Sequence, residues 1–160
     1  MKLLKFVLIA LLGLMLLVSC EDSKNDDNNV EADVWIGTWL STGGDVAPIL
    51  VALFAYDSVR VEFKDDNTLT LQSHVANGAW TSLPGTYVIT ESANGDIHGF
   101  AANYTAFEQE GIIEIIGDNM RLEAVQTVPD IGATIPTVGA GFGADPALGT
   151  INIHTYKRVN

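Results

Sequence analysis

Alternation of apolar and polar residues is the dominant pattern of the chain from residue 59 onward. In the stretch 59–64, two valines and a phenylalanine alternate with arginine, glutamate and lysine. A period of two residues is typical of a strand that buries one face. After a turn at 65–67, Leu69 and Leu71 continue the pattern. The same reasoning predicts eight strands, at residues 34–40, 59–64, 68–72, 85–91, 97–104, 111–116, 120–128 and 150–159.

Two stretches break this alternation. Residues 46–56 contain no charge, and Pro48 suits the first turn of a helix. We expect a short helix there, lying over one end of the folded domain, with a fully buried strand as the alternative. Residues 129–149 are rich in proline and glycine and have no period, yet they carry several large apolar side chains. A connection this long is uncommon, and we expect an ordered loop folded against the strands.

Eight strands joined mostly by short hairpins, with a single helix, indicate an all-β fold. We expect an eight-stranded antiparallel barrel, with a sandwich as the alternative. Eight strands closed on themselves leave an interior that holds packed side chains or one small ligand. Residues 34–160 have the length of one domain.

Residues 1–19 have the layout of a secretory signal peptide, with two lysines before an apolar run of about 13 residues. A membrane-spanning helix needs roughly 20 residues, so a cleaved signal is favoured over the alternative of an uncleaved anchor. Residues 17–20, Leu-Val-Ser-Cys, resemble the lipobox of bacterial lipoproteins. The resemblance implies cleavage by signal peptidase II between Ser19 and Cys20. It also implies lipidation of Cys20 and attachment to a membrane through the acyl chains.

Residues 20–33 are acidic and nearly devoid of large apolar side chains, which predicts a flexible tether. Within them, residues 23–27 resemble the export signals that follow the cysteine in Bacteroidetes surface lipoproteins. The resemblance implies a cell-envelope protein anchored in the outer membrane, and a surface or a periplasmic position both stay open.

Charge and cysteine usage exclude several partners. Without Lys2 and Lys5 of the signal, six basic residues remain against twenty acidic ones, a net charge of −14. Such a charge repels nucleic acid and anionic lipid head groups, so we expect neither as a partner. The sole cysteine is consumed by lipidation, which leaves no disulfide and no cysteine-based metal site.

The first and last predicted strands carry matching features. Gly37-Thr38-Trp39 lies in the first strand, and Tyr156-Lys157-Arg158 lies in the last. The G-x-W motif resembles the opening of lipocalin-like barrels. Residues between 110 and 143 extend the resemblance to lipocalin-like lipoproteins of the Bacteroidetes. It implies that Trp39 closes the base of the barrel with the cationic Arg158 across it, whereas the alternative is an ordinary core tryptophan of another β fold.

The resemblance to lipocalin-like proteins implies a small apolar or amphipathic ligand inside the barrel. Residues on the inward face of the predicted strands, and two on the predicted helix, are the candidates for binding it. They are Phe63, Leu71, Tyr87, Phe100, Met120 and Leu122, with Leu53 and Phe54 on the helix. The alternative for each is plain core. Residues 74–84, which include Asn77-Gly78 and Trp80, predict a polar loop. The alternative function is a filled barrel that binds a surface protein or a glycan through the loops at 74–84 and 129–149.

The sequence offers little sign of chemistry. No serine lies in a G-x-S-x-G motif, and the three histidines are scattered singly. We therefore expect no enzyme activity, no catalytic residue, no metal and no cofactor. Asp57-Ser58-Val59 resembles the motif that Bacteroidetes glycosylate on serine or threonine, so Ser58 is a candidate for O-glycosylation. The alternative is that Ser58 simply begins a strand.

Overall fold

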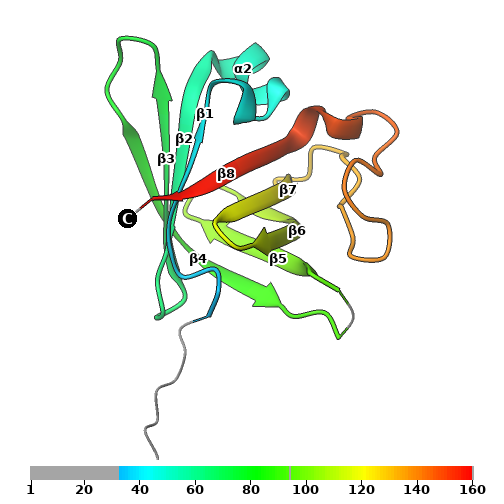
Figure 1. The fold of residues 1–160 in the computed structure, drawn as a ribbon. Helices are drawn as coiled ribbons and strands as arrows, with labels where there is room; N and C mark the ends of the chain where they lie inside the picture. Colours follow the sequence, from blue (N-terminus) through cyan, green and yellow to red (C-terminus); the bar gives the residue numbers. More distant parts are fainter. Residues whose placement is uncertain (1–32, 94, 160) are drawn as a thin grey trace, which may run out of the picture. The chain divides into compact units, whose positions relative to one another are not determined.

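The computed structural model describes residues 33–93 and 95–159, and these form a closed barrel of eight antiparallel strands (Figure 1). Each strand pairs with the next, and the last strand pairs with the first. The strands are β1 (Gly37–Thr42), β2 (Tyr56–Phe63), β3 (Thr68–Val75), β4 (Thr81–Thr90), β5 (Ile97–Tyr104), β6 (Glu108–Ile116), β7 (Asn119–Val128) and β8 (Ile153–Val159). The expected fold class is therefore confirmed.

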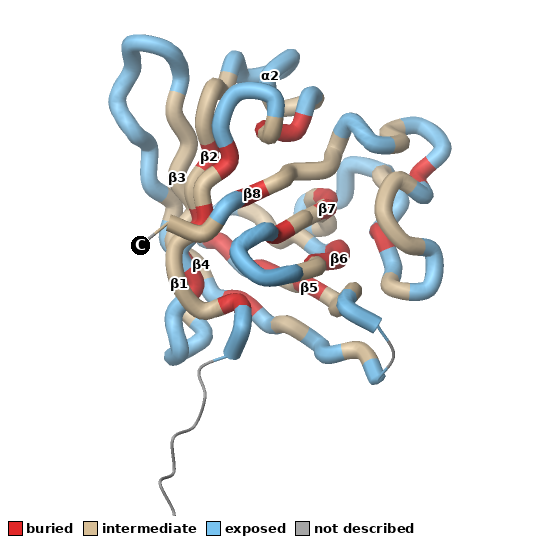
Figure 2. The backbone as a smooth tube through the Cα atoms, in the orientation of Figure 1, coloured by how far each residue is buried: buried red, intermediate tan, exposed pale blue. Residues whose placement is uncertain are grey.

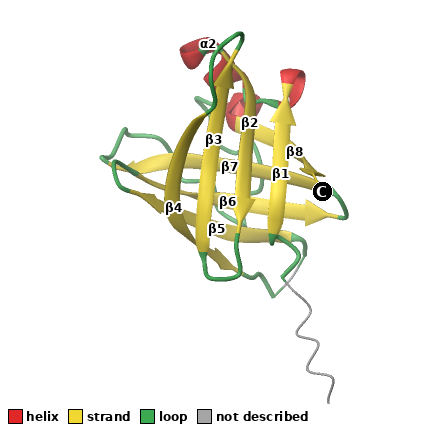
Figure 3. Ribbon diagram, turned by 90° about the vertical axis from the view of Figure 1, so that its left-hand side faces the viewer, coloured by secondary structure: helices red, strands yellow, loops and turns green. Residues whose placement is uncertain are grey.

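A single short α-helix, α2 (Pro48–Phe54), accompanies the strands among the described residues. Pro48 stands in its first turn, as the sequence predicts, and Ala55 ends it in the left-handed conformation with φ 56°. Two 3-10 turns, η1 (Gly43–Asp45) and η2 (Gly149–Asn152), precede α2 and β8. In Figure 3, α2 lies at one end of the barrel, and β1 begins at the opposite end.

The prediction of a loop at 74–84 is wrong at both ends. β3 continues to Val75, and β4 begins at Thr81. In the first residues of β4, only Leu83 is both apolar and turned inward, opposite Leu71 of β3. Alternation cannot reveal a strand with so few apolar residues. Ladder pairing and a side-chain hydrogen bond from Gln72 of β3 extend the strand instead.

Every strand contributes at least one buried residue (Figure 2). The core cluster includes Phe63, whose ring meets Tyr87 edge to face at 4.9 Å and Phe100 at 6.3 Å. Gly85 makes room for part of this packing, because a Cβ there would lie 2.6 Å from the Asn103 carbonyl oxygen and 2.8 Å from the Tyr104 ring. The barrel interior is thus packed with aromatic side chains across its middle layer.

The long connection between β7 and η2 folds onto the outer face of β7. Glu123 points outward from that strand and is fully buried, and its Oε2 accepts a hydrogen bond from the Gly143 amide at 2.7 Å. The guanidinium of Arg121 lies 4.1 Å from the centre of the Phe142 ring. The expected ordered loop, folded against the strands, is therefore confirmed.

None of the helices in 33–93 and 95–159 is long and apolar enough to span a bilayer. The predicted signal peptide, the lipidation site Cys20 and most of the predicted tether lie outside the described residues.

Candidate functional site

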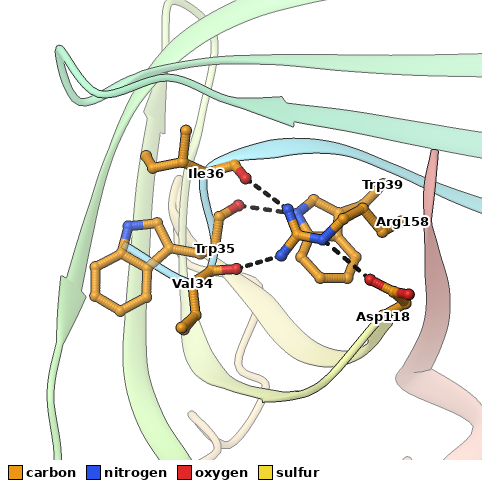
Figure 4. Close-up of polar contacts among 6 residues, drawn as sticks. All are labelled: Val34, Trp35, Ile36, Trp39, Asp118 and Arg158. Atoms are coloured by element: carbon orange, nitrogen blue, oxygen red, sulfur yellow. Dashed lines mark hydrogen bonds and ion pairs between the residues drawn. The ribbon is translucent and has the colours of Figure 1, made fainter. Parts of the chain in front are cut away.

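Trp39 and Arg158 close one end of the barrel (Figure 4). The guanidinium carbon of Arg158 lies 4.1 Å from the centre of the Trp39 ring, and Trp39 is fully buried. The Trp39 indole Nε1 donates to the Trp35 carbonyl at 2.8 Å. Arg158 donates from Nη1 to the Ile36 carbonyl at 2.7 Å and from Nη2 to the Val34 carbonyl at 2.5 Å. The chain before β1 is thereby fastened to the last strand.

The turn between β6 and β7 joins the same end. Arg158 Nε lies 3.5 Å from Oδ1 of Asp118, and the Arg158 amide donates to the Asp118 carbonyl at 2.9 Å. The ion pair involves an exposed carboxylate and adds little stability, so the backbone hydrogen bond is the firmer link. We call this arrangement the sealed end.

Four of the candidate ligand-binding residues lie in the packed middle layer. Phe63, Tyr87, Phe100 and Met120 are each no more than 5% exposed. The Tyr87 hydroxyl also donates to the Lys64 carbonyl at 2.7 Å, which fixes its ring. The structure places these four side chains in the core.

Inward-facing side chains nearer α2 are less completely buried. Leu71 and Leu122 follow Leu69 and Met120 along the inner faces of β3 and β7, and unlike them they keep part of their surface accessible. Leu83 on β4 and Ala124 on β7 do the same. All four pack against the core cluster, so their side chains lie on the barrel side of the sheet. These inward-facing side chains are therefore only partly buried, and we call the end of the barrel nearest to them the α2 end.

Helix α2 covers the α2 end loosely. Ala47, its N-cap residue, is fully buried, and its amide donates to Nδ1 of His154 on β8 at a long 3.4 Å. Leu50 packs against the core cluster. The candidate residues Leu53 and Phe54 are 67% and 53% exposed, so they lie on the solvent side of the helix.

Several polar groups lie near the inner surface of the α2 end. The His154 ring stacks on the Tyr156 ring at 5.3 Å, and burial lowers the pKa of His154 to about 4. The imidazole is therefore neutral at pH 7. Burial raises the pKa of both Tyr104 and Tyr156, which are likewise neutral. The Ser41 hydroxyl is buried and has no hydrogen-bond partner among the described residues.

Sequence reasoning missed His154 and Tyr156, although a signal for them was present. Residues two apart on a strand face the same way, so placing Arg158 across Trp39 also places Tyr156 and His154 on the inner face of β8. Ser41 follows Trp39 on β1 by the same rule.

A second cluster lies on the outer face of β2 and β3, around Trp80. The Trp80 ring lies 5.1 Å from the His74 ring and 4.9 Å from the guanidinium carbon of Arg60. His74 Nδ1 lies 2.7 Å from Oδ1 of Asp57. Sequence reasoning treated His74 and Trp80 as parts of a polar loop, because neither belongs to an alternating stretch.

The structure keeps the three histidines apart. His74 is on the outer face, His154 is inside the α2 end, and the His98 ring lies 6.5 Å from Trp35 near the sealed end. Among residues 33–93 and 95–159, no group of three metal-ligating side chains is suited to hold an ion. Ser58 is half-buried within β2, where it pairs with Thr42 and His74.

Comparisons with protein-family models, with curated proteins and with solved structures find no match.

Proposed function

We propose that the protein binds a small apolar or amphipathic molecule inside the barrel and performs no chemistry on it. The observation that carries the proposal is the gradient of burial along the inner faces of β3 and β7. Leu69 and Met120 are fully buried, whereas Leu71 and Leu122, one step nearer α2, keep accessible surface. One end of the barrel is sealed, and we propose that the partly buried apolar side chains at the other end leave room for a ligand.

The lining at the α2 end suits such a ligand. Leu71, Leu83, Leu122 and Ala124 offer apolar surface, and burying ligand surface against them contributes about 25 cal/mol per Å². The neutral His154 and the tyrosines behind it supply a few groups that hydrogen-bond without charge. Binding sites for small molecules commonly combine an apolar lining with a few polar groups.

Helix α2 is the proposed gate. It has no fully buried residue, and the hydrogen bond from Ala47 to His154 is long. Few buried contacts make local opening inexpensive. We propose that the ligand enters when α2 moves away from this end.

We further propose that the protein is a lipoprotein with a lipocalin-like barrel, anchored at the cell envelope of a Bacteroidetes-type bacterium. The support is the order of basic residues, apolar run, small residue and Cys20 at the start of the chain, together with the acidic stretch after it. Two or more acyl chains on Cys20 would make attachment to the outer membrane stable.

The test is binding of the neutral fluorophore N-phenyl-1-naphthylamine to the domain Ala32–Asn160, a compact unit that contains all eight strands. We expect saturable fluorescence enhancement with a micromolar Kd. The change Leu71→Trp fills the proposed binding space and should weaken binding at least tenfold. The matched control is Thr70→Trp, one residue away on the outer face of the same strand, which should bind like the unaltered domain.

Absence of saturable binding by the unaltered domain would contradict the proposal and favour a filled barrel that acts only through its surface. Equal binding by both variants would place the fluorophore outside the barrel and would contradict it as well.

A further inference from the structure

Neutral polar groups on the inner face of the barrel lack hydrogen-bond partners within the protein. His154 Nδ1 accepts the amide hydrogen of Ala47, so the ring nitrogen that carries the proton is Nε2. Among the described residues, no hydrogen bond engages this Nε2 or the hydroxyl groups of Ser41, Tyr104 and Tyr156. Buried polar groups in proteins are nearly always paired, so this set indicates a partner that is not part of the chain.

These four polar groups lie near one another. The His154 ring stacks on the Tyr156 ring at 5.3 Å on the inner face of β8. Ser41 is fully buried on the inner face of β1, the strand that pairs with β8. Burial, and to a lesser degree the nearby Tyr104, raise the pKa of the Tyr156 hydroxyl. We call His154, Tyr156, Ser41 and Tyr104 the inner polar cluster.

No charged side chain accompanies the inner polar cluster. Among the described residues, Arg158 is the only charged residue on the inner faces of the strands, and the carbonyls of Val34 and Ile36 hold it at the sealed end. His154 is neutral at pH 7, because burial lowers its pKa to about 4. A carboxylate or an ammonium group placed beside the cluster would lose its hydration without gaining an opposite charge, which costs free energy.

Apolar side chains adjoin the inner polar cluster. Leu122 lies opposite His154 in the pairing of β7 with β8, and both residues keep part of their surface accessible. A plain hydrocarbon would cover Leu122 but would leave Nε2 of His154 unpaired. A molecule that joins an alkyl part to one uncharged oxygen group, such as a hydroxyl or an ester, satisfies both.

We propose that the interior ligand is an uncharged lipid whose oxygen-bearing head accepts a hydrogen bond from His154 Nε2 and whose alkyl part lies against Leu122. The inference rests on the proposed function and names the class of ligand for the same site. Because Ala47 fixes the proton of His154 on Nε2, the ring presents a donor, and the acceptor comes from the ligand. Free fatty acids and alkylamines are charged at pH 7, so we expect the site to discriminate against them.

The experiment is displacement of N-phenyl-1-naphthylamine from the domain Ala32–Asn160 at pH 7.5 by 1-decanol, decanoate or decylammonium. We expect 1-decanol to displace the fluorophore at a concentration at least tenfold lower than either charged compound. The change His154→Leu removes the donor and enlarges the apolar lining, yet it should weaken 1-decanol binding at least fivefold. His154→Gln keeps an N–H donor and should retain part of the binding. The matched control is His98→Leu, which alters a histidine beside Trp35 and should change nothing.

Circular dichroism checks that each variant is folded. If His154→Leu does not fold, NMR of the unaltered domain decides, because 1-decanol should shift the Nε2–H signals of His154 and leave the ring signals of His98 in place. Signals of His154 that do not move would overturn the inference.

Two further outcomes would overturn this inference and leave the proposed function intact. One is displacement by decanoate or decylammonium at the same concentration as 1-decanol. The other is undiminished 1-decanol binding by a folded His154→Leu variant, which would show that apolar surface alone holds the ligand. Absence of saturable fluorophore binding by the unaltered domain would overturn the inference and the proposed function together.

Discussion

At the scale of single residues, His154 is the most unusual group of the interior. Its ring stacks on Tyr156, and its Nδ1 accepts the amide hydrogen of Ala47, which requires the neutral form with the proton on Nε2. A protonated ring could not accept this bond and would hold an unpaired charge beside the core. Burial therefore lowers the pKa of His154 to about 4.

This lowered pKa predicts a loss of stability in mild acid. Between pH 6.5 and pH 4 the unfolded chain binds a proton at His154 that the folded protein does not bind. Stability is therefore fully present above pH 6.5 and falls as the pH drops towards 4, by up to about 3 kcal/mol. Urea unfolding followed at several pH values measures the slope.

The variant His154→Gln should lack this slope, and His98→Gln should keep it whatever its overall stability, because His154 is still present. An NMR titration gives a second reading, in which the His154 ring signals should not shift above pH 5. A His154 that titrates near pH 6.5 would contradict the prediction.

Some contacts between residues could be predicted from the sequence, and others could not. The contact of Arg158 with Trp39 was suggested by motifs at the two ends of the chain, because closing a barrel brings the first and last strands together. The cluster around Trp80 was not suggested. Its members come from β2, β3 and the residue before β4, and the register that aligns Arg60, Gln72 and Ser82 is fixed by pairing, which sequence alternation does not specify.

At the scale of elements, most strands could be predicted from the sequence, because their apolar residues alternate with polar ones. Helix α2 could be predicted from Pro48 and from the lack of charge around it. The beginning of β4 could not, since β3 holds it mainly through polar contacts. The course of the loop after β7 was also beyond sequence reasoning. A loop of this composition has no period, and single buried polar residues such as Asp145 and Glu123 determine its path.

Asp145 organises this loop and gives a prediction for it. It is 6% exposed, and its carboxylate accepts hydrogen bonds from the amides of Thr134, Ala147 and Leu148 at 2.6 to 3.1 Å. The backbone donors hold the pKa of Asp145 below its usual range. Replacing it with alanine leaves three amides without their acceptor, so we expect Asp145→Ala to release the loop while the barrel stays folded.

Hydrogen exchange measures this release. The amides of Thr134, Ala147 and Leu148 should exchange at least tenfold faster in Asp145→Ala, with the β-strand amides unchanged. The control Asp130→Ala removes an exposed aspartate of the same loop that accepts one hydrogen bond, from Gly132. Uniform loss of protection throughout the barrel would show instead that the loop and the barrel unfold together.

At the scale of the whole molecule, the two ends of the barrel differ in how they are closed. The sealed end joins the chain before β1, β8 and the β6–β7 turn through Arg158, whereas the α2 end is covered by a helix without a fully buried residue. The described chain enters at the sealed end, where Val34 and Ile36 accept hydrogen bonds from Arg158.

The anchor itself is testable in the full chain. If the sequence Leu-Val-Ser-Cys directs lipidation, cells fed an alkyne-bearing palmitate should label the protein, and Cys20→Ser should lose the label completely because the chain holds no other cysteine. Ser19→Ala keeps a small residue before the cut and is the matched control that should stay labelled. Label that survives Cys20→Ser would place the acyl chains elsewhere.

The domain Ala32–Asn160 should show the same melting temperature as the released full-length protein, since all eight strands lie within it. A lower melting temperature of the domain would show that residues 1–31 contribute to folding.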